Sequence, residues 1–288
     1  QRMKNDEMIT LAKFLAISGI ILPMLPHKNL IPDINLTPYS IWLATVVVSG
    51  ISYLSYLLKR YVFHESGVLV SGIIGGLYSS TATISVLARK SRKASEQEAN
   101  EYVAAMLLAV SMMFLRFMIL ILIFSREIFT SIYPYLLIMS VVAAVVAWFI
   151  HSRHRRSKDM ADESEDEDSS NPLEFKVALI FATLFVVFTV LTHYTLVYAG
   201  TGGLNLLSFV SGLSDITPFI LNLLQNTGSV AVLVVVACSM QAIISNILVN
   251  MFYALFFAGK GSKLRPWILG GFGTVIGVNL VLLLFFYL

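Results

Sequence analysis

Long apolar runs alternate with short polar segments along the whole chain. Each run approaches the length of about 20 residues that a membrane-spanning helix needs. The pattern therefore predicts an all-α polytopic membrane protein. Its nine apolar segments comprise residues 9–25, 39–58, 67–88, 102–124, 132–150, 175–198, 203–225, 230–257 and 267–288.

The composition agrees with a chain that is surrounded by lipid. Of the 288 residues, 57% are hydrophobic and 13% are charged, whereas an ordinary soluble domain carries about 25% charged residues. The formal net charge of +3 is too small and too dispersed to indicate binding to nucleic acid. The single cysteine, Cys238, lies within an apolar run and excludes a disulfide framework. We therefore expect the lipid bilayer, and no nucleic acid, as a partner.

Two of the nine segments are interrupted by small and polar residues. The third contains GIIGGLYSSTAT at residues 72–83, and the seventh contains SFVSGLSDITP at residues 208–218. Glycine in the middle loosens a helix. Thr217 followed by Pro218 is typical of an N-cap and a first helical residue, and the hydroxyls of residues 79–81 offer a second cap. Each segment is therefore predicted to form two half-helices that meet at a polar break.

The Lys and Arg residues of the loops, counted together with Lys176 at the start of the sixth segment, indicate whether these two segments cross the membrane. If all nine segments cross, the two sides receive 8 and 10 of these residues, which gives no orientation signal. If the third and seventh segments each enter and leave on one side, the division becomes 16 against 2. We therefore predict seven spans plus two re-entrant hairpins, with the N-terminus in the cytoplasm.

An internal repeat supports the two hairpins. One constant shift along the chain, which we call the repeat offset, aligns Gly76 with Gly212, Thr81 with Thr217, and four further identical pairs without a gap. Three predicted spans separate the starts of the copies, so the copies have opposite orientation and the hairpin tips meet near the midplane, where transporters with broken helices bind their substrates and ions. The predicted organisation is an extra span at 1–30, a first repeat at 31–150 with hairpin 67–88, an acidic cytoplasmic loop at 151–170, and a second repeat at 171–288 with hairpin 203–225.

Three sequence motifs carry a family resemblance. They are GGLYSSTATISVLARKSR at residues 75–92, NPLEFK at 171–176 and SGLSD at 211–215. The chain resembles, over nearly its whole length, the uncharacterised C-terminal membrane domain that follows an MgtC/SapB domain in many bacterial and archaeal proteins. The resemblance implies a multi-pass protein of the prokaryotic inner membrane that handles ions, with an MgtC/SapB domain as a further partner. The positions carried over from the family are Ser79, Ser80, Thr81, Arg89, Arg116, Asp215 and Asn246.

Asp215 is the one carboxylate that lies well inside an apolar segment. An ionisable residue at the centre of a bilayer costs about 2.5 to 3.5 kcal/mol on insertion scales, which favours a functional site for a cation or a proton. Ser79, Ser80, Thr81 and Thr217, with carbonyl groups freed at the glycine break, complete an oxygen set suited to a hard cation. Two alternatives stay open. Asp215 could cap a helix, and the half-helix N-termini could attract an anion.

Arg116 lies about 13 Å from the end of its segment, which is long for a side chain that snorkels to the interface. It needs a buried partner, either Asp215 as a counter-charge or backbone carbonyls of the hairpin. Gln241 and Asn246 belong to a polar stripe on the eighth segment, which would line a pathway or form interhelical hydrogen bonds.

The candidate chemistry favours transport over catalysis. No Ser/His/Asp set, HExxH motif or P-loop is present, so we expect no enzymatic activity and no cofactor. The predicted function is an inner-membrane transport protein that moves a small inorganic ion, preferably a cation, through the midplane site. An ion channel of the same architecture and a non-transporting regulatory or assembly subunit are the alternatives. Gly270, Gly273 and Gly277 form a small-residue helix face, and a homodimer through it is a further expectation.

Overall fold

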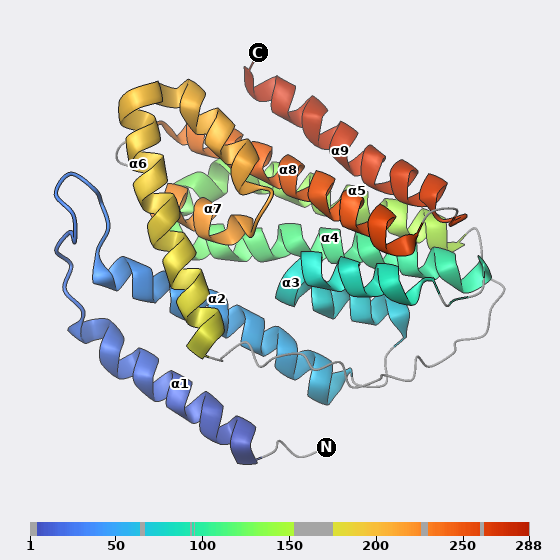
Figure 1. Ribbon diagram of the computed structural model, residues 1–288, viewed down its shortest axis with the longest axis horizontal. Coiled ribbons are helices and arrows are strands. Elements are labelled where there is room, and N and C mark those ends of the chain that lie inside the picture. Colours follow the sequence, from blue (N-terminus) through green and yellow to red (C-terminus); the bar gives the residue numbers. More distant parts are fainter. Residues whose placement is uncertain are drawn as a thin grey trace.

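The computed structural model describes residues 5–63, 67–92, 94, 96–152, 175–225, 230–259 and 262–287. Within these ranges the chain consists of helices joined by short connections (Figure 1). Of the acidic loop predicted at 151–170, the first two residues belong to the last turn of α5, and the rest, with most of the NPLEFK motif, lies outside the described residues. The helices are α1 (Asn5–Met24), α2 (Pro38–Leu57) with a short π-helical extension (Leu58–Val62), α3 (Val68–Lys90), α4 (Glu96–Phe124), α5 (Arg126–Ser152), α6 (Phe175–Ser211), α7 (Ile216–Gln225), α8 (Val232–Ala258) and α9 (Arg265–Tyr287).

The all-α polytopic membrane fold predicted from the sequence is confirmed. Seven of the described helices are long and apolar enough to cross a membrane by length and composition: α2, α3, α4, α5, α6, α8 and α9. Large apolar side chains such as Trp148 and Leu284 point away from the protein, as lipid-facing residues do. One helix of the seven, α3, is not a straight rod.

The helix α3 is a hairpin of two half-helices. Its backbone leaves the helical conformation at Ser79, where φ is −157° and ψ is 107°. A Cβ atom added at Gly75 would overlap the side chain of Thr83, although residues eight apart in a continuous helix lie about 12 Å apart along the axis. The chain therefore reverses at Ser79, and Figure 1 shows the two halves side by side. We call residues 68–90 hairpin A.

The glycines of hairpin A do not form its break. A Cβ atom on Gly72 would overlap the backbone of Ala105, and one on Gly76 would overlap the backbone of Ala109. Both glycines remain helical and are buried. Their role is close packing against α4, so the expectation of a glycine break is wrong, and the reversal occurs at Ser79, after the last of these glycines.

A second hairpin consists of the last part of α6 and the short helix α7. The chain bends at Gly200, whose φ of 60° favours glycine, and then runs back through residues 201–211 (Figure 1). After a break at 212–215, α7 begins at Ile216. The sequence suggested Thr217 as the cap and Pro218 as the first helical residue. In the structure the cap is Asp215 and the first helical residue is Ile216. We call residues 201–225 hairpin B.

The two hairpins pack in the same way against the helix that follows each of them. Gly76 of hairpin A packs on Ala109 of α4, and Gly212 of hairpin B packs on Ser245 of α8. The repeat offset that relates the two glycines also relates Ala109 to Ser245. In Figure 1 the ends of hairpin A lie at the right of the bundle and those of hairpin B at the left. This arrangement agrees with an inverted repeat.

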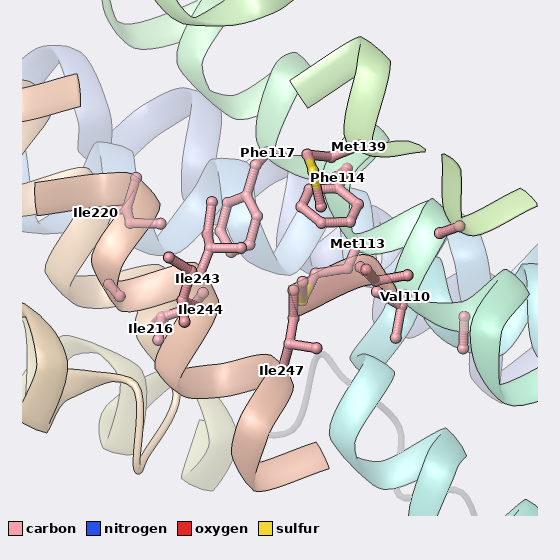
Figure 2. Packing of buried hydrophobic residues seen from close by; sticks show 14 of the residues in the cluster. Val110, Met113, Phe114, Phe117, Met139, Ile216, Ile220, Ile243, Ile244 and Ile247 are labelled. Carbon is pink, nitrogen blue, oxygen red and sulfur yellow. The ribbon is translucent and has the colours of Figure 1, made fainter. Parts of the chain in front are cut away.

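The core between the hairpins is apolar and tightly packed. Phe114 and Phe117 of α4, Ile220 of α7, and Ile243 and Ile247 of α8 belong to one buried cluster (Figure 2). Since lipid removes most of the hydrophobic drive between membrane helices, such van der Waals packing holds them in register. The cluster fixes hairpin B relative to α4 and α8.

Candidate functional site

The tips of the two hairpins meet at a cavity of about 440 Å³. Hairpin A contributes Ser79, Ser80 and Thr81 to the lining, and hairpin B contributes Asp215 and Thr217. The structure therefore brings together all five residues that the sequence predicted as ion ligands. Further lining residues come from α2, α4, the first turns of α6, and α8.

Each second half-helix begins with a side-chain cap. In hairpin A the Ser79 Oγ accepts a hydrogen bond of 3.3 Å from the Ala82 amide. In hairpin B the Asp215 Oδ1 accepts one of 2.9 Å from the Thr217 amide. Ser79 and Asp215 are again related by the repeat offset. The alternative in which Asp215 caps a helix is therefore correct for one of its two carboxylate oxygens, Oδ1.

Asp215 nevertheless keeps a carboxylate oxygen for other partners. Its side chain is exposed and lines the cavity. Among the described residues, the only hydrogen bond to the carboxylate is the one from the Thr217 amide. Capping and ligand binding are compatible here, because a carboxylate has two oxygens and about four acceptor positions.

Arg116 of α4 connects the two hairpin tips. Its Nη1 donates a hydrogen bond of 2.8 Å to the Tyr78 carbonyl of hairpin A, and its Nη2 donates one of 3.0 Å to the Thr217 Oγ1 of hairpin B. Its guanidinium carbon also lies 5.5 Å from the centre of the Phe117 ring. A single side chain thus holds both tips.

The relation between Arg116 and Asp215 is electrostatic but indirect. The carboxylate acts on the guanidinium through space, yet within the described part of the chain no ion pair joins the two side chains. Both meet at Thr217, which accepts from Arg116 through its hydroxyl and donates to Asp215 through its amide. The structure thus shows the alternative in which Arg116 binds a backbone carbonyl of the hairpin.

Asn246 makes the corresponding contact at hairpin B. Its Nδ2 donates hydrogen bonds to the carbonyls of Gly212 at 3.3 Å and Ser214 at 3.4 Å, and its Oδ1 accepts one of 3.1 Å from Asn250. Ser214 corresponds to Tyr78 by the repeat offset. In both hairpins, therefore, the carbonyl of the residue just before the capping residue accepts a hydrogen bond from a side chain on the long helix that follows the hairpin.

Two other residues singled out in the sequence lie outside the cavity. Gln241 is not among its lining residues, although Asn246 on the same helix is. Arg89 is also absent from the lining, and its guanidinium lies 4.3 Å from the centre of the Phe257 ring. The cavity lining therefore includes only part of the polar stripe on α8.

Sequence reasoning missed the contribution of α2. Ser49 and Ser52 line the cavity together with the hairpin tips. Their i, i+3 spacing places both hydroxyls on one face of a helix. That pattern was visible in the sequence, but nothing in it indicated which helix would face the tips.

The site offers hydroxyl groups, one carboxylate and one guanidinium. The carbonyls of Tyr78, Gly212 and Ser214 each accept a hydrogen bond from a side-chain donor. Among the residues that the structure describes, no three His, Cys, Asp or Glu side chains are grouped to hold a metal ion. The oxygen donors present suit hard ions such as alkali and alkaline-earth cations.

Comparison with known proteins places the chain in a family. A family model described as a domain of unknown function, DUF4010, matches residues 46–258. The chain belongs to the DUF4010 family. The DUF4010 match includes both hairpins and every residue that lines the cavity. This agrees with the uncharacterised membrane domain expected from the sequence, whereas the association with MgtC/SapB stays a prediction.

One curated relative of this DUF4010 protein is an uncharacterized protein of Aquifex aeolicus (strain VF5). It is 27% identical over 221 residues, which cover 76% of this chain and 94% of the relative. No solved structure matches the chain.

Proposed function

We propose that this DUF4010 protein carries a small ion, preferably a cation, across the inner membrane of a prokaryote. The observation that supports the proposal is the convergence of two broken hairpins on one cavity that contains the Asp215 carboxylate. Transporters built from inverted repeats bind their substrates and ions at such breaks near the bilayer midplane.

The preference for a cation rests on which groups are still available in the cavity. The Nη1 and Nη2 of Arg116 and the Nδ2 of Asn246 donate to carbonyl and hydroxyl oxygens. Of the nitrogen atoms of these two side chains, only the buried Nε of Arg116 has no hydrogen-bond partner among the described residues. Asp215 has an unused carboxylate oxygen, and Ser79, Ser80 and Thr81 add hydroxyls. A carboxylate exposed to a membrane cavity is best balanced by a bound cation.

The contacts of Arg116 favour a carrier over an open channel. Because this side chain bonds to both hairpin tips, the tips are tied together across the cavity. An ion held in the cavity would then cross by movement of one repeat against the other, as in alternating access. The proposed orientation, with the N-terminus in the cytoplasm, rests on the division of Lys and Arg residues between the loops.

The test is a flux assay with the purified chain in liposomes. Uptake of Na⁺, K⁺, Mg²⁺, H⁺ and Cl⁻ is measured for the wild type, for Asp215→Asn and for Asp33→Asn. Asp33 lies in the loop between α1 and α2, outside the cavity lining, so this variant removes an equal charge elsewhere. We expect Asp215→Asn to accumulate normally and to lose flux by at least about tenfold, which is 1.4 kcal/mol in a barrier, while Asp33→Asn matches the wild type.

Two results would contradict the proposal. The first is a wild-type protein that moves none of the five ions. The second is an Asp215→Asn variant whose flux equals that of Asp33→Asn.

A further inference from the structure

The positive charge of Arg116 is not explained by its contact with hairpin A. At hairpin B the neutral amide of Asn246 holds Ser214, whose carbonyl corresponds to that of Tyr78. The repeat offset places Phe252 at the position of Arg116, and this side chain is 61% exposed at the outer surface. Holding the end of a half-helix therefore does not require a cation, and the charge needs another explanation.

Arg116 differs from Asn246 in reaching the opposite hairpin. Asn246 bonds to two carbonyls of hairpin B only, whereas Arg116 bonds to Tyr78 of hairpin A and to the Thr217 hydroxyl of hairpin B. The Thr217 amide is in turn bonded to the Asp215 carboxylate. The guanidinium thus lies beside the oxygen atoms that the proposed cation would use, and it already occupies one of them.

We infer that Arg116 is a tethered cation that fills the ion site when the carrier is empty. The inference rests on the proposed function. An arriving cation takes the Thr217 hydroxyl and the Asp215 carboxylate, and it repels the guanidinium, which keeps its bond to the Tyr78 carbonyl. When the ion leaves, Arg116 returns to Thr217 and again balances the charge of Asp215.

This role has a consequence for the empty carrier. Without Arg116, the Asp215 carboxylate of the empty carrier would have no positive charge near it, and moving an unbalanced charge through the apolar part of the membrane is unfavourable. The empty carrier would then change its conformation slowly. The loaded carrier would be unaffected, because the bound ion supplies the positive charge.

Net uptake and exchange separate these two steps. Net uptake requires the empty carrier to return after each delivery, whereas exchange of labelled for unlabelled ion across the membrane requires only the loaded form. A loss of net uptake with exchange preserved is therefore the signature of a group that serves the empty state. A residue that merely supports the fold would change both rates together.

The experiment uses the full chain in liposomes with radioactive Na⁺, or with Rb⁺ if the ion screen identifies K⁺ instead. Net uptake into liposomes without internal ion is compared with exchange against the same unlabelled ion inside. For Arg116→Gln we expect net uptake to fall at least tenfold and exchange to stay within about twofold of the wild type. Arg126→Gln is the matched control, because Arg126 is an exposed residue at the start of α5, outside the cavity lining, and it should leave both rates unchanged.

Arg116→Lys keeps the charge but offers a single ammonium group in place of the two-pronged guanidinium. If the positive charge is what the empty carrier requires, net uptake of Arg116→Lys stays within about threefold of the wild type. This result would support the inference even if Arg116→Gln fails to accumulate. Equal losses of net uptake and exchange in Arg116→Gln would overturn the inference, as would a loss of net uptake in Arg116→Lys. Absence of any flux in the wild type would instead contradict the proposed function.

Discussion

Replacing Gly76 by alanine should destabilise the protein, although alanine is the better helix former. The gain in helix propensity is about 1 kcal/mol. Against it stands a clash with α4, because the added Cβ would lie 2.5 Å from the Ala109 Cα and 2.6 Å from its carbonyl oxygen. Overpacking of this kind costs about 1 to 3 kcal/mol. Both neighbouring atoms belong to the backbone and cannot rotate away, so the clash outweighs the gain.

The same clash should also disturb the cavity. To reach an ordinary contact distance, hairpin A would have to move by about 1 Å away from α4. The Tyr78 carbonyl lies close by, just beyond Gly76 in the chain, and is bonded to Arg116 at 2.8 Å. A shift of that size stretches the bond beyond the range in which hydrogen bonds are effective. We therefore expect Gly76→Ala to lose flux as well as stability.

The assay is unfolding by SDS in mixed micelles, which gives the free energy of unfolding of Gly76→Ala against the wild type. The matched control is Gly50→Ala in α2, where an added Cβ meets no atom within 4 Å. We expect Gly50→Ala to be neutral or more stable by up to about 1 kcal/mol and Gly76→Ala to be less stable by up to about 2 kcal/mol. A Gly76→Ala variant at least as stable as Gly50→Ala would refute the close packing of hairpin A on α4.

Two further predictions concern the segments around the hairpins. In a background without the natural cysteine, single cysteines are placed at Ser66 and Ala94, on either side of hairpin A. Both should react with a membrane-impermeant reagent from the cytoplasmic side, because the loop charges place both positions there. Labelling from opposite sides would show that α3 crosses the membrane. Deletion of residues 159–168, an acidic stretch too polar to bury apolar surface, should leave expression and flux largely unchanged. Loss of expression would show that this stretch packs against the protein.

The sequence was sufficient to predict the helical segments and the two hairpins. Segment length reports the thickness of the hydrocarbon core, and the loop charges report the side of the membrane. Both are local properties of the chain. The repeat offset that aligns Gly76 with Gly212 also relates their packing, because each glycine contacts the helix that follows its hairpin in the same way.

The position of each break could not be predicted, because it depends on contacts between helices. Gly72 and Gly76 looked like helix breakers, but packing against α4 keeps them helical. The reversal falls at Ser79, whose hydroxyl caps the next half-helix. Likewise, α7 begins at Ile216, ahead of the expected Pro218, because Asp215 supplies the cap.

The hydrogen-bond partners of Arg116 could not be predicted from the sequence either. Its depth in the membrane indicated that it needs a partner, and Asp215 was the nearest candidate by charge. Which oxygen atoms it reaches depends on how α4 lies between the two tips, and the structure gives the Tyr78 carbonyl and the Thr217 hydroxyl. The bond from Arg116 to Thr217, whose amide is bonded to Asp215, is what supports a role in the empty carrier.

The most direct test of the central claim is to block the cavity itself. Ser52 lines the cavity from α2, and the nearby Gly50 on the same helix faces open space. In a Cys238→Ser background, Ser52→Cys and Gly50→Cys are each treated with a charged methanethiosulfonate reagent, and labelling is verified by mass. If the ion passes between the hairpin tips, labelling of Ser52→Cys should reduce flux at least about tenfold, reversibly on reduction, while labelled Gly50→Cys keeps its flux. Full labelling of Ser52→Cys with unchanged flux would contradict the account.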